Sequence, residues 1–424
     1  MAALAGWRTV ADHLEGLRHE QAGQEAHAVL EMLPQPLRSA PPQGEPAHWT
    51  ADPIGLRRSC EVTVRRLAAL PVETPSLQLM IDRTIEVLSG ISDALDGLAL
   101  LAADPARPVA RSVRIGIRVP DWLPSLVNAG RAFLTISAVA VFWVVTEWPS
   151  GAQAMAFAAI GVILVAPRAD QAYGVALRFT IGTSIGAILA AITAFAVLPK
   201  FETFSALAIA IGVVLVPAGA GVALSWQTPV FTGLAAWFIP LLGPANQMNY
   251  NTVQFYNTAV AIVGGIGVAA LSFRLILPLS PRFRARRLMA LSLRDLSRLA
   301  AGTIAWQISD WRNRIYGRFS VLPDEAQPLQ RSQLLAALSV GAEIITLRAI
   351  ASQLDLVSKL DPAFEVVARG NGALAIERLT DLDQAVASFP GTVALQARAS
   401  ILVVSEALTR HAAYFDAGVP SEVH

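Results

Sequence analysis

Few residues of this 424-residue chain could do chemistry in an apolar setting. Between Ala132 and Phe273 only six side chains carry a charge: Glu147, Arg168, Asp170, Arg178, Lys200 and Glu202. A carboxyl group inside a membrane marks a proton pathway, and a guanidinium can hold a carboxylate by two parallel hydrogen bonds. These residue types indicate the handling of protons or anions.

Three carboxylates are available to carry a proton. Glu147 closes the first long apolar segment, next to Trp148 and Pro149, and is the first candidate. Asp170 lies in a turn between two apolar segments and is the second, ahead of Glu202. The alternatives are a solvated loop carboxylate at Glu147, beside a tryptophan at the membrane surface, and a helix cap at Asp170.

Two arginines are candidates to bind an anionic substrate. Arg131 stands near the start of the first apolar segment, and Arg178 lies about one turn into the third. The alternative for Arg178 is that its long side chain reaches the headgroups of the lipids. Trp226 and Trp237, near and on the fifth segment, are candidates to stack on an aromatic solute, although packing is the commoner use of such residues.

Two motifs that imitate enzyme sites fail on their context. Gly182 to Gly186 reads Gly-Thr-Ser-Ile-Gly, but all six histidines lie outside the apolar region. Gly265 to Ala270 imitates a dinucleotide loop without a preceding strand. We interpret both as glycines that let helices approach closely. The chain also lacks a Walker A lysine motif and a cysteine pair, so we expect no cofactor, no catalytic metal and no enzyme.

The elements that hold these residues must be membrane helices. The chain is 54% hydrophobic and 15% charged, and no charge or histidine occurs from Thr203 to Phe273. A water-soluble domain of that length needs a charged exterior, so the surface of this region must face lipid. We predict an all-α polytopic membrane protein with helical domains at 1–125 and 279–424 around a block of six transmembrane helices at 126–278.

The six spans follow from apolar runs separated by proline, glycine and polar residues. They are 129–147, 151–166, 174–198, 204–224, 228–243 and 253–277. The second and fifth are short for a bilayer, at about 24 Å if each residue rises 1.5 Å. Outside the block, helices are expected at 4–33, 53–70, 76–101, 282–303, 327–357, 373–388 and 391–414.

Charge sets the expected orientation and partners. Arginines crowd both ends of the block, at 107–131 and 282–287, which predicts that the N- and C-termini are cytoplasmic. The first residues do not read as a signal peptide. A net charge of +1 gives no basic surplus for nucleic acid, so nucleic acid is not an expected partner.

The block also resembles a known family. Asp121-Trp122, Asn128 to Phe133, Phe142-Trp143, Glu147 to Gly151, Pro167 to Phe179 and Pro278-Leu279 are similar in order and spacing to the fusaric acid resistance and aromatic acid exporter family. The resemblance covers about residues 121–290. It implies an efflux protein of the bacterial inner membrane that exports aromatic carboxylic acids, commonly with a periplasmic adaptor protein.

Family members usually carry two six-span blocks, so the resemblance implies either the C-terminal part of a longer pump or a half-size form that dimerises. We expect a transporter of organic anions driven by the proton-motive force. The alternatives from other classes are an organic-anion channel and a non-transporting membrane scaffold with helical domains.

Overall fold

The computed structural model describes residues 2–17, 20–38, 52–102, 121–200, 203–224, 227–245, 250–276 and 279–416. The chain divides into two compact units. One unit is residues 121–281, which we call the membrane block, and the other is 1–120 with 282–424, which we call the helical unit. Within the described ranges every regular element is a helix, as the sequence predicts.

The membrane block contains the predicted helices. In chain order they are α7 (Leu123–Thr146), α8 (Gly151–Val165), η1 (Ala166–Gln171), α9 (Ala172–Ile192), η2 (Thr193–Val197), η3 (Leu198–Lys200), α10 (Phe204–Ala223), α11 (Thr228–Leu242) and α12 (Thr252–Leu275). The η2 segment is a π-helical turn that joins α9 to η3 without a break.

Six described helices are long and apolar enough to cross a membrane, and five of them are spans that the sequence predicts. Five of them belong to the block: α7, α10, α12, Gly151–Arg168 and Ala172–Lys200. The sixth is α15 (Pro328–Leu354) of the helical unit, and 72% of its most apolar stretch is buried by protein. The fifth predicted span is α11, which at 15 residues is as short as the sequence indicates.

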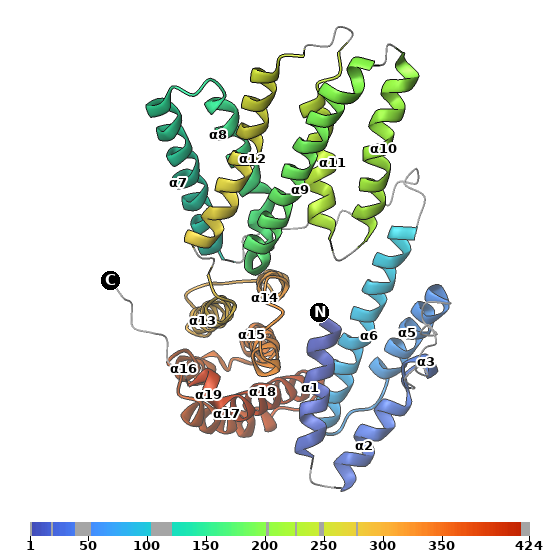
Figure 1. Cartoon of the computed structure of the whole chain (residues 1–424). Helices are drawn as coiled ribbons and strands as arrows, with labels where there is room; N and C mark the ends of the chain where they lie inside the picture. The colour runs from blue at the N-terminus through green and yellow to red at the C-terminus, as the bar shows by residue number, and fades with distance from the viewer. Residues whose placement is uncertain are drawn as a thin grey trace. The chain divides into compact units, whose positions relative to one another are not determined.

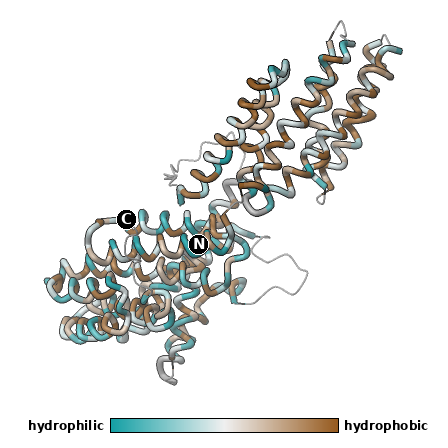
Figure 2. The backbone as a smooth tube through the Cα atoms, turned by 60° about the vertical axis from the view of Figure 1, so that its left-hand side comes forward, coloured by the Kyte–Doolittle hydropathy of each residue, from teal (hydrophilic) through white to brown (hydrophobic). Residues whose placement is uncertain are grey.

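The six helices of the block lie side by side in the spatial order α7, α8, α12, α9, α11, α10 (Figure 1). Apolar residues run along most of their length, whereas the helical unit alternates apolar and polar residues (Figure 2). The outer helices expose large apolar side chains, for example Val145 at 77% on α7 and Val216 at 71% on α10. Such exposure is stable only where lipid covers it.

Glycines set the distance between α9 and α11. A Cβ atom on Gly182 would stand 1.8 Å from the carbonyl oxygen of Val230, and one on Gly186 would stand 2.9 Å from that of Leu234. From the other side, a Cβ atom on Gly233 would meet the Phe179 carbonyl oxygen at 2.4 Å. The two backbones are in contact, which confirms the prediction that Gly182 and Gly186 are packing residues.

The α8–α12 contact is built in the same way. A Cβ atom on Gly265 would lie 2.5 Å from the Ala154 carbonyl oxygen, and one on Gly161 would lie 2.7 Å from the Ala269 Cβ. The dinucleotide-like motif is therefore a helix-packing surface, as predicted. Lipid gives helices little hydrophobic reason to associate, so close van der Waals contact between small residues has to hold them together.

The helical unit contains helices from both ends of the chain. They are α1 (Ala2–Gly16), α2 (Glu20–Glu31), α3 (Gln35–Arg38), α5 (Pro53–Ala68), α6 (Pro75–Ala102), α13 (Pro281–Ala300), α14 (Ile308–Ser320), α15, α16 (Val357–Ala368), α17 (Gly372–Ala387), α18 (Thr392–Arg410) and α19 (Ala412–Phe415). The predicted helix 4–33 is two helices, and α14 and α16 are additional. Both are short, at 13 and 12 residues.

The N-terminal and C-terminal segments pack into one unit, although the sequence suggested a separate domain at each end. His13 of α1 is 3% exposed and ties three helices together. Its Nδ1 lies 2.7 Å from Glu406 Oε1 of α18, and its Nε2 lies 2.7 Å from Ser76 Oγ of α6. Thr9 and Ser339 add a hydroxyl contact of 3.3 Å between α1 and α15.

The glycine contact between α9 and α11 yields a stability prediction. We expect Gly182→Ala to destabilise the block by at least about 2 kcal/mol, because the new methyl group overlaps a backbone oxygen that cannot move without separating the helices. The midpoint of unfolding in detergent measures the effect. Gly174→Ala is the matched control, since a Cβ atom there meets nothing within 4 Å. Equal midpoints for the two variants would contradict the packing argument.

Candidate functional site

Arg131 is the buried charge of the membrane block. It lies on α7, about 12 Å along the axis from the start of the helix, and is 1% exposed. Among the described residues of the block, the other charged side chains whose surroundings are described are exposed or half-buried. Placing an arginine at the centre of a span costs about 2.5–3.5 kcal/mol on insertion scales, so the surroundings of Arg131 have to compensate for part of such a cost.

The partners of Arg131 are all neutral. Its Nε and one terminal nitrogen donate to the carbonyl oxygen of Ile276, at 3.3 and 2.8 Å. The other terminal nitrogen donates to Asn128 Oδ1, and the guanidinium carbon lies 4.6 Å from the centre of the Phe273 ring. Ile276 caps the C-terminus of α12, so Arg131 satisfies a carbonyl that the helix leaves open.

Two donors of Arg131 have no acceptor among the described residues. A guanidinium has five N–H groups, and the three hydrogen bonds above use three of them. No described carboxylate lies within ion-pair distance of Arg131. The group is therefore a full positive charge in an apolar setting, with one free N–H on each terminal nitrogen, and is chemically suited to a carboxylate.

An apolar groove of about 720 Å³ lies between α7, α8 and α12, nearer the C-terminal end of α7 than Arg131 is. It is lined by Ala138, Val139, Phe142, Thr146, Trp148, Pro149, Ala154, Val260, Gly264, Gly265 and Val268. These residues come from α7, α8, α12 and the turn after α7, which lie side by side in Figure 1. The groove has the size and lining of a site for a small aromatic molecule.

One face of α7 connects the arginine to the groove. The buried residues of α7 are Arg131, Thr135 and Val139, spaced four residues apart. Val139 also lines the groove, as do Phe142 and Thr146 further along α7. Because residues four apart lie one above the other on a helix, the charge and the groove share a single seam between α7 and its neighbours.

The two candidate proton carriers differ in what the structure describes. Glu147 follows the last residue of α7 in the left-handed conformation, with φ 51°, and its side chain is exposed without an ion-pair partner among the described residues. It stands about 24 Å along the helix axis from Arg131. Asp170 lies in η1, and its side chain falls outside the described part of the structure, as does Glu202 altogether.

The remaining candidate residues are not brought together with Arg131. Arg178 is exposed on α9 and makes no hydrogen bond or ion pair with any described residue. Trp237 on α11 packs edge-on against Phe157 of α8, with ring centres 4.7 Å apart. Its indole N–H is buried and has no acceptor in the described part of the chain. Trp226 lies outside the described residues.

Sequence reasoning missed the groups that surround Arg131. Asn128 and Arg131 are three residues apart on one helix, a spacing that would have pointed to their hydrogen bond. The Ile276 carbonyl and the Phe273 ring lie more than 140 positions away in the chain, and no local pattern connects them to α7. Asn257 also has a partner far away in the sequence, because its side-chain oxygen accepts a hydrogen bond from the Trp148 indole at 3.1 Å.

Comparisons with known proteins agree with this architecture. The sequence model of the fusaric acid resistance protein family matches residues 1–415. An uncharacterized transporter of Gluconobacter oxydans (strain 621H) is 28% identical over 203 residues, which are 47% of this chain and 27% of that protein. The chain thus spans about a quarter of the length of that relative. No solved structure matches.

The indole hydrogen bond at the groove end of the seam leads to a prediction. We expect Trp148→Phe to lower the stability of the block by at least about 1 kcal/mol, because a smaller aromatic ring replaces the indole and the bond to Asn257 is lost. Unfolding midpoints of this variant, of Asn257→Ala and of the double variant form a cycle. If the two effects add without coupling, the hydrogen bond does not hold α12 to the turn after α7.

Proposed function

The chain belongs to the fusaric acid resistance protein family and is a multi-pass membrane protein, and on that premise we propose that it exports aromatic carboxylic acids or related organic anions. The observation that carries this proposal is Arg131, a buried cation whose partners are neutral and which keeps two N–H donors for a ligand. A carboxylate matches that fork in charge and in geometry. The similarity to a protein named as a transporter supports the same class of activity.

We propose that the protein lies in the bacterial inner membrane with both termini in the cytoplasm. The support is the cluster Arg282, Arg284, Arg286 and Arg287, which directly follows the last helix of the block. In this orientation Arg131 is near the cytoplasmic end of its helix and the groove near the outer end. An exported anion would meet the guanidinium first and the groove afterwards.

The proposed path runs along the seam between α7 and α12. Arg131 is covered in the present conformation, so substrate capture requires a state in which α7 has moved and uncovered it. Only a narrow stripe of α7 is buried, which favours such a movement. The aromatic ring of the substrate would then be received by the apolar groove, where Phe142 and Trp148 offer partners for stacking.

Two further elements of the proposal concern protons and partners. Glu147 is the proposed proton carrier, with Asp170 as second choice, because Glu147 adjoins Thr146 and Trp148 of the groove. We also propose that a second six-span block, from another copy or from a longer form of the chain, closes the lipid-facing side of the groove. A periplasmic adaptor protein would receive the exported solute.

Substitution of the two arginines tests the anion site. In proteoliposomes loaded with labelled benzoate, we expect Arg131→Gln to reduce export at least tenfold, because the charge that binds the carboxylate is lost. Arg178→Gln is the matched control and is expected to keep more than half of the wild-type rate, since Arg178 is exposed and outside the seam.

Arg131→Lys guards against a variant that simply fails to fold. It keeps the charge but loses the two-point geometry, so we expect a higher KM for benzoate with a smaller change in kcat. Normal export by Arg131→Gln, together with loss of export in Arg178→Gln, would move the anion site to α9. Equal transport of benzyl alcohol and benzoate would show that charge plays no part.

An imposed pH gradient tests the coupling. We expect the wild-type chain to concentrate benzoate against its gradient, and Glu147→Gln to lose this accumulation while downhill flux persists. Asp170→Asn is the second variant. If the wild-type protein equilibrates benzoate but never concentrates it, the activity is that of a channel. If both variants still concentrate benzoate, neither carboxyl carries the proton.

A further inference from the structure

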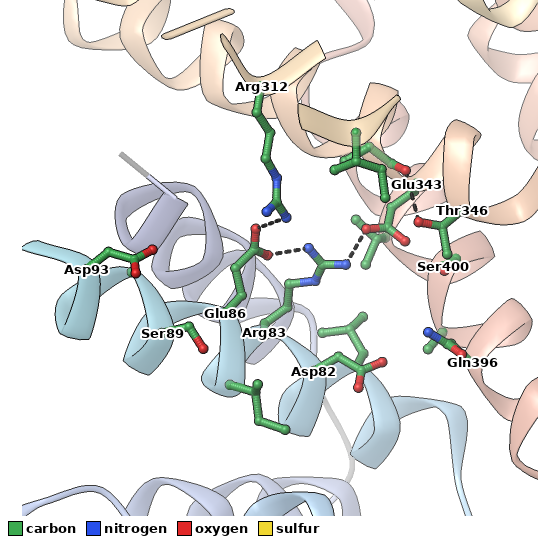
Figure 3. A pocket seen from close by; sticks show the side chains of 17 residues that line it. Asp82, Arg83, Glu86, Ser89, Asp93, Arg312, Glu343, Thr346, Gln396 and Ser400 are labelled. Carbon is green, nitrogen blue, oxygen red and sulfur yellow. Dashed lines mark hydrogen bonds and ion pairs between the residues drawn. The ribbon is translucent and has the colours of Figure 1, made fainter. Parts of the chain in front are cut away.

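A polar cavity of about 320 Å³ lies inside the helical unit, and all its lining residues belong to that unit. Helix α6 from the N-terminal part of the chain forms one wall, and α14, α15 and α18 from the C-terminal part form the others. Figure 3 shows its charged lining at close range. Neither the family match nor the transporter relative assigns a role to it.

Both arginines of the cavity are already used by glutamates. Arg83 donates to Glu86 at 2.6 Å and, through its other terminal nitrogen, to Glu343. Arg312 donates to the second oxygen of Glu86, also at 2.6 Å. These ion pairs form the chain of dashed lines in Figure 3. Two guanidinium groups and two carboxylates balance, so this part of the lining is neutral.

The remaining charges of the lining are negative. Its acidic residues are Asp82, Glu86, Asp93 and Glu343, against the two arginines, which leaves an excess of two negative charges. Asp82 is half-buried, and its hydrogen bond comes from the neutral amide of Gln78 at 2.8 Å. No described basic group lies within ion-pair distance of Asp82. A half-buried carboxylate without a cationic partner is costly.

The electrostatics of Asp82 agree with this geometry. Burial raises the pKa of its carboxyl above the ordinary value, and the negative charges of Glu343 and Glu86 raise it further. The hydrogen bond from Gln78 and the charge of Arg83 oppose the shift without cancelling it. A cation placed beside Asp82 would supply the counter-charge that the protein does not.

A second and independent feature is the hydroxyl of Ser400. This residue lines the cavity from α18 and is 4% exposed, yet its hydroxyl has no hydrogen-bond partner among the described residues. Glu343, at 3% exposed, uses one of its two oxygens for Arg83. The wall of the cavity therefore presents polar atoms that are free to accept hydrogen bonds from a molecule inside it.

We propose that the polar cavity binds a small organic cation, an alkylammonium ion, through Asp82, Glu343 and Ser400. An ammonium group carries three N–H donors and no acceptor, and the three side chains offer acceptors together with the missing charge. Gln396 lies across from Asp82 in Figure 3, where its amide can contact the carbon chain or a further polar group of the ligand. The site is independent of the proposed transport activity.

A metal ion fits the cavity less well than an ammonium. In the described ranges no three His, Cys, Asp or Glu side chains are grouped closely enough to hold a metal. Arg83 also stands between Glu86 and Glu343, so these two carboxylates cannot converge on one ion (Figure 3). An anion would meet the negative excess of the lining and be repelled.

Calorimetric titration of the purified full chain with butylamine tests the proposal. We expect saturable binding that weakens at least tenfold in Asp82→Asn and about threefold in Ser400→Ala, because the first removes the charge and the second one acceptor. Glu377→Gln is the control, since Glu377 is an exposed carboxylate outside the cavity, and its affinity should stay within twofold of the wild type.

Two isosteres separate this site from non-specific binding. 1-Butanol lacks the charge, and tetramethylammonium lacks the N–H donors, so both should bind at least tenfold more weakly than butylamine. Unchanged affinity in Asp82→Asn would overturn the proposal. So would equal binding of 1-butanol, or no binding of butylamine to a wild-type protein that is folded by circular dichroism.

The raised pKa of Asp82 gives a separate stability prediction. Its folded-state pKa lies above the unfolded value of about 3.9, so the folded chain binds more protons between the two values and loses stability as pH rises through that window. The charged groups that act on it are Arg83 and Glu86 on α6 and Glu343 on α15. Asp93 on α6 and Arg312 on α14 line the same cavity.

Asp82→Asn removes the titration and keeps an acceptor for Gln78. We therefore expect the variant to be at least as stable as the wild type at pH 7, with a flatter dependence of the unfolding midpoint on pH from 4 to 7. This outcome would also show that the variant folds, so that a loss of butylamine binding reports on the site. A variant less stable than the wild type at pH 7 would contradict the assignment.

Discussion

The structure of the membrane block depends on one constraint, the absence of water from the interior of a bilayer. Backbone groups there must be satisfied within the segment, which leaves helices as the available element for these spans. Because water is absent, the hydrophobic effect does not drive two helices to associate inside the bilayer. Contact between backbones takes its place, and it is possible because Gly182, Gly186, Gly233 and Gly265 carry no side chain at the points of closest approach.

The constraint also explains why one arginine can be buried. Arg131 donates hydrogen bonds to the Ile276 carbonyl at the end of α12 and to the side-chain amide oxygen of Asn128 on its own helix. These bonds offset part of the free-energy cost of burying Arg131, and they also give two acceptor oxygens the donor that they lack. Its charge is nevertheless not neutralised by the described protein. The block thus combines a tight centre, where α8, α12, α9 and α11 pack through small residues, with an α7 that is attached by a narrow stripe and carries the charge.

The helical unit follows the rules of a water-exposed protein, and the contrast is clearest between two arginines. Arg83, in the polar cavity, pairs with two glutamates, because acidic residues are plentiful there. Arg131 finds neutral oxygens in a region where six charges occur between Ala132 and Phe273. The polar cavity has an excess of carboxylate and the membrane block an unpaired guanidinium. The two units therefore carry unbalanced charges of opposite sign.

The sequence by itself determined the class, the positions of the helices in the membrane block and the roles of the glycine motifs. These depend on local properties, namely the length of apolar runs, the scarcity of charge and the spacing of small residues along one helix face. It also reduced the ionisable candidates to a handful. It did not separate Arg131 from Arg178, because both stand in an apolar run and local sequence does not say which side of a helix meets another helix.

Tertiary structure decided that question by bringing Phe273 and Ile276 against Arg131 and leaving Arg178 exposed. It also joined the two ends of the chain in one unit and so created the polar cavity. Such features arise from contacts between segments more than a hundred residues apart. Their physical basis is the mutual burial of surfaces from distant helices, which no single stretch of sequence encodes.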